Sequence, residues 1–460
     1  MKARPLKILL HAGVLAAGAL AVTMATAKIT QDDLKQLDGN LTPLGAERAA
    51  NKDGTIPAWT GKWLGAPTGV AYKAGERYQD PYADEKPLYV ITAQNMAQYD
   101  KQLTDGLKAL FKKYPETFKM PIYATHRDFR YDDGTYKAIR TYAPQIEMLG
   151  EGNGVKNSPP TLPYPIPKTG LELLWNLRFA SAIESERAVY DQAVVYADGK
   201  VAWGKVKYEI WSPKDGQHFD AKAPMNARAF YRMYTELPLR DRGSIITGYT
   251  VYDSPEPDSN RAWSYNPGTR RVRQAPEYGY DQPFGPGGFR TVDDDHFFNG
   301  SPERYDWKIV GKRELYVPYN NYRMSSPSIK YQDLLTKGHA DPSNMRYELH
   351  RVWALEATLK QGFRHQYAKR IIYIDEDSWY GVLADNYDSR GQLWRTNIQA
   401  NVYAYDAKRF YPTAVFFHDL ISGAYLADRL TNEGQPPRLN SEPKYVEAYF
   451  SPDAARGAGN

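Results

Sequence analysis

The 460-residue sequence contains no cysteine. A chain without thiols forms no disulfides, and it offers no thiolate nucleophile, cysteine-bound zinc or cysteine-bound iron–sulfur cluster. Its stability must therefore come from packing alone, and a chain of this length can bury a large core.

Apolar runs long enough to span a membrane are also absent after the first 27 residues. The N-terminus is different, because Lys2, Arg4 and Lys7 precede an uncharged apolar run over 8–22, and Ala25-Thr26-Ala27 then supplies small residues. This order is typical of a cleavable signal peptide, and the run is shorter than the ~20 residues of a spanning helix. We expect residues 1–27 to be removed and the mature protein to begin at Lys28 in the periplasm or at the outer membrane, with a retained signal anchor as the alternative.

The chain has little excess charge. Without the three basic residues of the predicted signal peptide, 56 of its 59 Lys and Arg residues remain against 54 acidic ones. This balance argues against a nucleic-acid partner. Aromatic residues are plentiful instead, with 37 Tyr and 10 Trp, which suits strands and also suits contact with lipid or sugar.

Catalytic motifs are missing as well. We find no His-Glu-x-x-His helix, no Gly-x-Ser-x-Gly elbow and no phosphate-binding glycine loop. The run Asp293-Asp294-Asp295-His296 has metal-ligand chemistry, but adjacent residues rarely converge on one ion, so a solvated turn is favoured. Asp375-Glu376-Asp377 follows a strand and is also interpreted as a turn. We therefore expect no catalytic residues, no metal and no cofactor, although carboxylates paired only in the fold stay open.

Periodicity predicts mostly strands after residue 185. Apolar residues at helical spacing predict one amphipathic helix over 92–114, and a short helix is expected over 171–178. The segments 189–196 and 201–211 form a predicted hairpin around Asp198-Gly199, and 380–387 with 392–405 form another. In the second hairpin Trp394, Ile398, Ala400 and Val402 alternate with Arg395, Asn397, Gln399 and Asn401, which predicts one buried and one solvated face. The basic run over 270–273 is interpreted as a charged edge strand, with anionic headgroups as the alternative.

Three blocks carry a resemblance to a known family: LTPLGAERAANKDGTIPAWTG (41–61), ERYDWKIVGKRELYVPYNNY (303–322) and RYELHRVWALEATLKQGFRHQYAKRIIYIDEDSW (346–379). The chain resembles a proteobacterial family of exported proteins of unknown function, some named outer-membrane lipoprotein-sorting protein. The resemblance implies an enlarged lipoprotein-carrier fold of class α+β, in which a large curved antiparallel half-barrel sheet wraps around helices. It also implies association with inner-membrane exporters of the resistance-nodulation-division type and with outer-membrane β-barrel proteins.

Together these features predict four regions: a signal peptide over 1–27, a helical and loop region over 28–170, the half-barrel sheet over 171–440, and a loosely ordered tail over 441–460. We expect a periplasmic carrier or adaptor that binds a hydrophobic, lipid-like molecule, with Trp353, Leu355, Trp394 and Ile398 as its ligand contacts. A ligand-free structural adaptor and, with less support, a hydrolase or isomerase acting on an apolar substrate are the alternatives.

Overall fold

The computed structural model describes residues 28–157, 162–180, 183–213, 227–257, 260–274, 280–440 and 445–458; the predicted signal peptide lies outside them. The α-helices are α1 (Gln31–Gln36), α2 (Asp105–Lys113), α3 (Asp133–Tyr142), α4 (Gly170–Phe179), α5 (Tyr331–Leu334) and α6 (Pro452–Ala458). Across the described ranges, none of the helices combines the length and the hydrophobicity that crossing a bilayer requires.

Most of the chain is β-structure. The strands are β1 (Tyr89–Ile91), β2 (Met120–Ile122), β3 (Glu147–Leu149), β4 (Gly154–Lys156), β5 (Ser185–Val195), β6 (Val201–Trp211), β7 (Ala227–Leu237), β8 (Ile245–Val251), β9 (Asn260–Asn266), β10 (Arg271–Gln274), β11 (Pro283–Phe284), β12 (Arg290–Thr291), β13 (Tyr305–Pro318), β14 (Tyr347–Leu359), β15 (Lys369–Asp375), β16 (Gly381–Tyr387), β17 (Leu393–Ala404), β18 (Arg409–Asp419), β19 (Tyr425–Leu430) and β20 (Arg438–Leu439).

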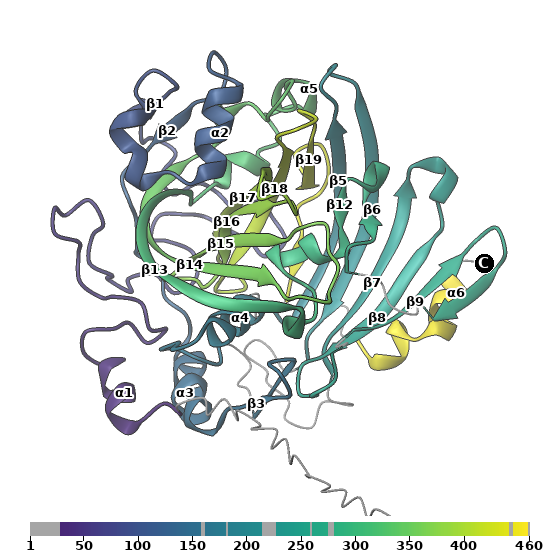
Figure 1. Ribbon diagram of the computed structural model, residues 1–460, viewed down its shortest axis with the longest axis horizontal. Helices are drawn as coiled ribbons and strands as arrows, with labels where there is room; N and C mark the ends of the chain where they lie inside the picture. The colour runs from purple at the N-terminus through teal and green to yellow at the C-terminus, as the bar shows by residue number, and fades with distance from the viewer. Residues whose placement is uncertain are drawn as a thin grey trace, which may run out of the picture.

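Sixteen of these strands form one sheet in the order β1-β2-β14-β15-β16-β17-β18-β19-β5-β6-β7-β8-β9-β10, with β13 on β14 and β20 on β5. Neighbours are antiparallel except for a single parallel pairing of β2 with β14. Figure 1 shows the sheet curving around from β13 to β9, so the predicted α+β class with one large curved antiparallel sheet is confirmed. β10 is the edge strand, as the basic run predicted.

Both predicted hairpins are present. β5 and β6 pair in register from Ser185 opposite Trp211 to Val195 opposite Val201. Their turn contains Gly199 at φ +90°, a left-handed conformation that glycine adopts without strain. β16 and β17 form the second hairpin around Gly391, which is also left-handed.

The predicted solvated face of β17 is buried, which corrects the sequence interpretation. Its side chains Arg395, Asn397, Gln399 and Asn401 are at most 8% exposed. On the other face, α2 packs against β16 and β17, while α4 contacts β13 and β14. Side chains of β5 to β9 and of residues 284–299 surround the polar face of β17, so Asn397 and Gln399 line an interior.

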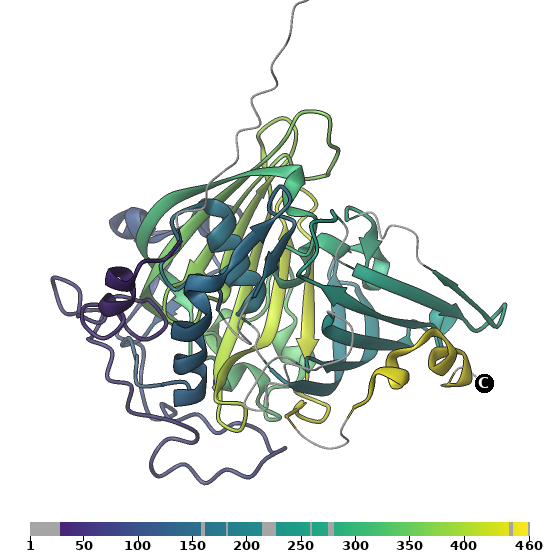
Figure 2. The same cartoon turned by 90° about the horizontal axis from the view of Figure 1, so that it is seen from below.

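Two further expectations differ from the structure. The predicted helix over 92–114 is broken into a 3₁₀ segment (Met96–Gln102) and α2, because the Thr104 side chain caps the backbone N–H of Leu107 and starts a new helix there. The tail is ordered over 445–458, where α6 packs against β8, β9 and β10 with Ala455 buried (Figure 2).

The side chain of Asp385 on β16 connects α2 to the sheet through a hydrogen bond. One carboxylate oxygen accepts hydrogen bonds from the backbone N–H of Gly106 at 3.1 Å and from the Thr396 hydroxyl at 3.0 Å, and the residue is fully buried. Burial raises the pKa of Asp385 to about 6, because the charged form is poorly solvated there.

This shift predicts an unusual pH dependence. Because the folded state holds the Asp385 proton more tightly than the unfolded chain, its stabilising contribution is complete below the unfolded pKa and is lost as pH rises through about 6. Asp385→Asn should therefore become more stable relative to wild type by about 3 kcal/mol between about pH 4 and about pH 7. Urea unfolding of both proteins across this range measures it, and a difference that does not change with pH would contradict the assignment.

Candidate functional site

A cavity of about 230 Å³ lies between the inner face of the sheet and the segment 283–299, which contains β11, β12 and a 3₁₀ segment, η5 (Val292–Phe297). Side chains of β5 to β9 and of β17 to β19 line it together with this segment. The volume exceeds the ~150 Å³ of an apolar protein cavity that accommodates benzene. The cavity can therefore hold a substantial part of a small apolar molecule.

One wall of the cavity is aliphatic. Val206 and Ile210 of β6, Met233 of β7, Ile246 of β8 and Ala262 of β9 all contribute to it. Met233 lies directly opposite Ile246 in the ladder, so these side chains form a continuous patch across four strands. Alternation along each strand places them on one face, because successive side chains of a strand point to opposite sides.

The wall formed by β5, β18 and β19 is polar. One guanidinium nitrogen of Arg429 donates to the Glu186 carboxylate at 2.7 Å, to the Tyr411 hydroxyl at 2.7 Å and to the Tyr190 hydroxyl at 2.8 Å. The Tyr411 hydroxyl also donates to Glu186 at 2.9 Å. The charge of Glu186 is therefore neutralised inside the protein.

Two uncharged polar atoms in the lining have no hydrogen-bond partner among the described residues: the Tyr380 hydroxyl and the Asn397 side-chain oxygen. Nε and Nη1 of Arg290 and Nε of Arg429, which also line the cavity, make no hydrogen bond with that part of the chain either. Tyr380 is 3% exposed and Asn397 is 2% exposed. Burial raises the pKa of Tyr380 well above its usual value, so its hydroxyl stays a donor at neutral pH. A buried polar atom without a partner costs about 1–3 kcal/mol, so a ligand that forms a hydrogen bond with one of these atoms removes that cost.

The segment that closes the cavity is held by ion pairs. Arg290 lies 3.4 Å from Asp428 and 3.5 Å from Asp295. Asp293 pairs with Arg370 and, at 3.1 Å, with His365. Burial alone would raise the pKa of Asp293, but the Arg370 guanidinium and His365 outweigh it and lower that pKa.

The run Asp293-Asp294-Asp295-His296 thus forms a short turn, as favoured from the sequence, but its first two residues are buried rather than solvated. Asp294 caps the segment by accepting from the Thr291 backbone N–H at 2.7 Å. Within the described ranges, this run is not a group whose ligand atoms converge on one point.

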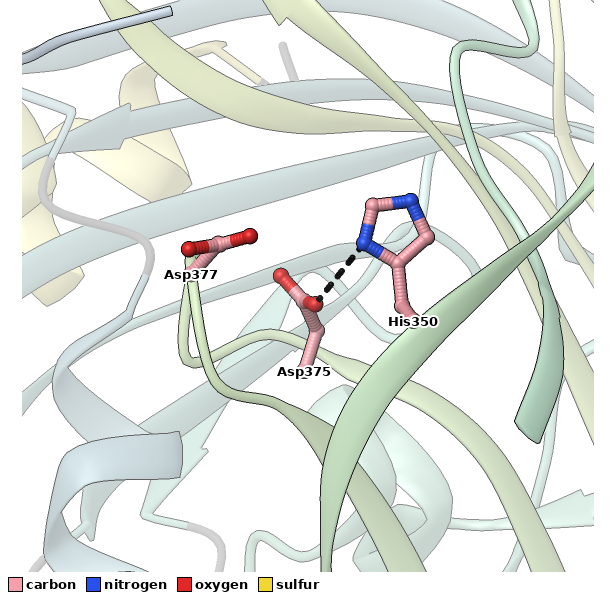
Figure 3. A group of neighbouring side chains, drawn as sticks. All are labelled: His350, Asp375 and Asp377. Carbon is pink, nitrogen blue, oxygen red and sulfur yellow. Dashed lines mark ion pairs between the residues drawn. The ribbon is translucent and has the colours of Figure 1, made fainter. Parts of the chain in front are cut away.

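A second feature is a buried cluster of opposite charges around the turn that follows β15, which we call the charge lock (Arg127, Lys312, His350, Asp375, Glu376 and Asp377). The guanidinium group of Arg127 donates hydrogen bonds to both carboxylate oxygens of Asp377, at 2.7 and 2.8 Å. The Lys312 ammonium donates to Glu376 at 2.8 Å. Figure 3 shows the carboxylate of Asp375 facing the ring of His350, 3.7 Å away, with Asp377 beside it.

The charge lock joins distant parts of the chain. Arg127 also donates to the backbone carbonyls of Glu47 and Pro57, at 2.7 and 2.9 Å. These carbonyls belong to the sequence block 41–61, so the N-terminal region is fixed to the sheet here. Burial and the nearby charge of Asp377 raise the pKa of both Asp375 and Glu376.

The charge lock also contains the geometry of a candidate cation site, since ligand atoms of His350, Asp375 and Asp377 lie within 4.8 Å of one another. However, both oxygens of Asp377 already accept from Arg127, and a guanidinium group repels a divalent cation. The protein's own cations therefore satisfy this site, and its contacts describe a structural anchor. The turn interpretation of 375–377 is right in geometry, but the residues are buried.

A model of the family described as "Protein of unknown function (DUF1329)" matches residues 90–456. The chain belongs to this family. The uncharacterized protein PA3922 of Pseudomonas aeruginosa is 39% identical over 463 residues, which cover 98% of this chain and 99% of that protein. The family resemblance inferred from the sequence blocks is thereby confirmed.

Solved structures show a more distant likeness to this DUF1329 protein. A DUF1329 family protein from Desulfovibrio piger aligns with 62% of this chain and 97% of its own, at 16% identity and a TM-score of 0.41. A domain described as an outer membrane lipoprotein-sorting protein from Vibrio parahaemolyticus aligns with 62% of this chain and 97% of its own, at 12% identity and a TM-score of 0.42. A LolA superfamily protein from Nitrosomonas europaea aligns with 63% of this chain and 100% of its own, at 12% identity and a TM-score of 0.35.

The four ligand contacts predicted from the sequence do not line the cavity of the DUF1329 chain. Leu355 and Ile398 are buried in the main hydrophobic core. Trp353 is half-buried and stacks on Trp379 at 6.4 Å, and Trp394 is half-buried with its ring N–H donating to Asp419 at 2.9 Å. No ligand tests these residues, so their role in binding stays a prediction.

The sequence carries a local signal for part of the cavity. Val206, Tyr208 and Ile210 alternate with Lys205, Lys207 and Glu209, and the structure places the first three in the lining. Tyr380 and Arg429 carried no comparable signal, because each lies where a strand begins or bends and its direction depends on contacts from remote segments. Arg429 has a left-handed backbone at φ +62°, a conformation that no local sequence pattern predicts.

The charge lock predicts a large stability loss from one substitution. Arg127→Met leaves Asp377 buried and unpaired, which should cost about 3–5 kcal/mol of unfolding free energy. Lys35→Met breaks an exposed pair with Asp32, whose side chains are 78% and 87% exposed, and should cost at most about 0.5 kcal/mol. Denaturant unfolding compares the two variants.

The charge itself is tested by a second variant. Arg127→Met combined with Asp377→Leu removes both charges and should recover part of the loss, because an apolar replacement of a buried pair is often tolerated. An Arg127→Met protein as stable as Lys35→Met would show that this pair is not an anchor.

Proposed function

We propose that the protein is a carrier for an amphiphilic, lipid-like molecule in the periplasm, and that it releases this molecule chemically unchanged. The observation that carries the proposal is the cavity between the curved sheet and segment 283–299, with an aliphatic wall spread over four strands. Shielding a hydrocarbon chain from water is favourable by about 0.8 kcal/mol per CH₂ group, so binding needs no chemistry.

The proposed location rests on the N-terminal sequence. A basic start, an apolar run over 8–22 and Ala25-Thr26-Ala27 form the order of a secretory signal peptide. An exporter of the resistance-nodulation-division type and an outer-membrane β-barrel protein are the partners that we propose for delivery and release, because family resemblance implies them.

Carriage without turnover fits the chemistry of the cavity lining. A general base must have a carboxylate or imidazole free to take a proton. Glu186 is held by Arg429, while Asp428 and Asp295 are both paired with Arg290. These contacts occupy three of the lining carboxylates, and the fourth, Asp294, accepts from Thr291 and Tyr367. The imidazole of His296 is then the lining base that a hydrolase would have to use. A ligand-free adaptor is the other alternative, and binding experiments separate it from a carrier.

Binding should depend on the aliphatic wall. Titration of the purified mature protein with the fluorescent apolar probe N-phenyl-1-naphthylamine should show saturable binding. Ile210→Trp places a large side chain in the cavity and should weaken binding about tenfold or more, which corresponds to about 1.4 kcal/mol. Lys207→Trp adds the same ring to the opposite face of β6 and should leave probe affinity unchanged.

Thermal unfolding provides an independent readout. A ligand that binds only the folded protein, present at about one hundred times its Kd, should stabilise the wild type by about 2.7 kcal/mol. Mass analysis of the ligand after incubation should show it unaltered. Absence of saturable probe binding by the wild type would favour the ligand-free adaptor, and chemical conversion of the ligand would favour an enzyme.

A further inference from the structure

The cavity is amphiphilic. The aliphatic patch lies on β6, β7, β8 and β9, which also contribute polar side chains such as Tyr208, Tyr231 and Thr250. The ion pair of Glu186 with Arg429 lies on β5 and β19, Asn397 lies on β17, and Tyr380 precedes β16. An apolar tail gains burial against the aliphatic patch, and a polar head loses fewer hydrogen bonds beside these four polar residues. A ligand that fits both regions therefore has one orientation.

The ionic groups of the polar wall are already paired. Arg429 is bound to Glu186, and Arg290 lies between Asp428 and Asp295. Arg178 and Arg228 also line the cavity, but their guanidinium groups lie over the rings of Tyr252 and Phe179, at 4.9 and 3.9 Å. Arg290 and Arg429 are thus balanced by carboxylates, although Nε and Nη1 of Arg290 and Nε of Arg429 make no hydrogen bond with the described residues. A head with a net charge would add an uncompensated charge to this buried wall, which is costly.

Two of the atoms in the wall that lack a hydrogen-bond partner within the described ranges are uncharged. The Tyr380 hydroxyl is a donor and the Asn397 side-chain oxygen is an acceptor, and both are buried in the lining without a partner among the described residues. A hydroxyl group is the simplest complement, because it both accepts and donates a hydrogen bond. An uncharged head with hydroxyl groups therefore satisfies both atoms without disturbing the ion pairs.

Tyr380 is held in place by the charge lock. Its carbonyl accepts from the backbone N–H of Asp375 at 2.9 Å, and its own N–H donates to the Ser378 hydroxyl at 3.3 Å. The Ser378 hydroxyl in turn donates to the Asp375 carboxylate at 2.6 Å. The turn is fixed before any ligand arrives, which lowers the entropy cost of binding at this hydroxyl.

We propose that the cavity selects amphiphiles with an uncharged, hydroxyl-bearing head, which binds Tyr380 and Asn397 while the tail lies against the aliphatic wall of β6 to β9. This inference rests on the proposed carrier function and names the chemical class of its cargo. Tyr380 is then a specificity-determining residue, since it touches the head of the ligand.

Three ligands with tails of equal length and different head groups test which head the cavity prefers. Monolauroylglycerol is neutral with two hydroxyls, laurate is anionic and dodecyltrimethylammonium is cationic. We expect the wild-type protein to bind monolauroylglycerol about tenfold tighter than either charged ligand, by displacement of N-phenyl-1-naphthylamine. Tyr380→Phe should weaken monolauroylglycerol binding about fivefold, which is the size of one net hydrogen bond, and should change the other two affinities by less than about twofold.

The same substitution has an internal stability control. Because the Tyr380 hydroxyl has no hydrogen-bond partner in the part of the chain that the structure describes, Tyr380→Phe should not lower the melting temperature of the ligand-free protein. Tyr425 is a matched buried tyrosine outside the cavity whose hydroxyl donates to the Thr336 carbonyl at 2.8 Å. Tyr425→Phe should lower the melting temperature and leave the order of ligand affinities unchanged.

The outcomes are distinguishable. Tighter binding of laurate or of the ammonium ligand by the wild type would overturn the neutral-head assignment while leaving the carrier function intact. An unchanged preference in Tyr380→Phe would also overturn it, because the head would then lie elsewhere. If none of the three ligands binds, the proposed function itself fails, and the inference fails with it.

Discussion

The connection between β15 and β16 depends on one buried ion pair, in which Arg127 holds both oxygens of Asp377. A paired, hydrogen-bonded arginine and carboxylate can be accommodated in a dry interior, whereas either charge alone is costly. Trp379, in the same turn, has a left-handed backbone at φ +61°, and its ring N–H donates to the Leu44 carbonyl at 3.0 Å. Such a conformation persists in a bulky residue only where the surroundings enforce it, so the lock, the strained turn and the N-terminal block support one another.

The consequence for function is that the polar end of the cavity is built before a ligand binds. The turn sets the direction of Tyr380, and the strands beyond it turn their polar faces inward because the sheet curves. Glu186 and Arg429 neutralise each other on the neighbouring strands β5 and β19, so this part of the wall is polar without a net charge. The aliphatic side chains of β6 to β9 complete the interior in which we propose that an amphiphile binds in a single orientation.

Features that depend on a few neighbouring residues, such as turns and an edge strand, were predicted correctly from the sequence. The hairpin turns at Gly199 and Gly391 and the edge strand at Arg271 follow from short patterns and are found in the structure. Burial was predicted less well. The alternation that includes Asn397 and Gln399 was interpreted as a solvent-exposed face of β17, but both side chains are buried. Alternation reports which side chains share a face, and only the three-dimensional curvature decides whether that face meets water or an internal cavity.

The candidate site was the least predictable part. Arg127 lies 250 residues from Asp377, and neither residue has a motif that would connect them. Tyr380 was seen only as the first residue of a strand, and Arg429 was not singled out. The resemblance to exported lipoprotein-sorting proteins predicted the curved sheet, but the ligand contacts at Trp353 and Trp394 were chosen from alternation alone and lie outside the cavity lining.

The central claim is that an amphiphile binds inside the curved sheet with its head at Tyr380 and its tail against β6 to β9. A crystal structure of the mature protein grown with a monoacylglycerol that carries bromine at the end of its acyl chain tests this most directly. The account predicts an anomalous bromine peak beside Ile210, Met233 and Ile246, with a ligand hydroxyl within hydrogen-bond distance of Tyr380. A bromine peak on the outer surface, or a cavity filled by the protein's own side chains, would contradict it.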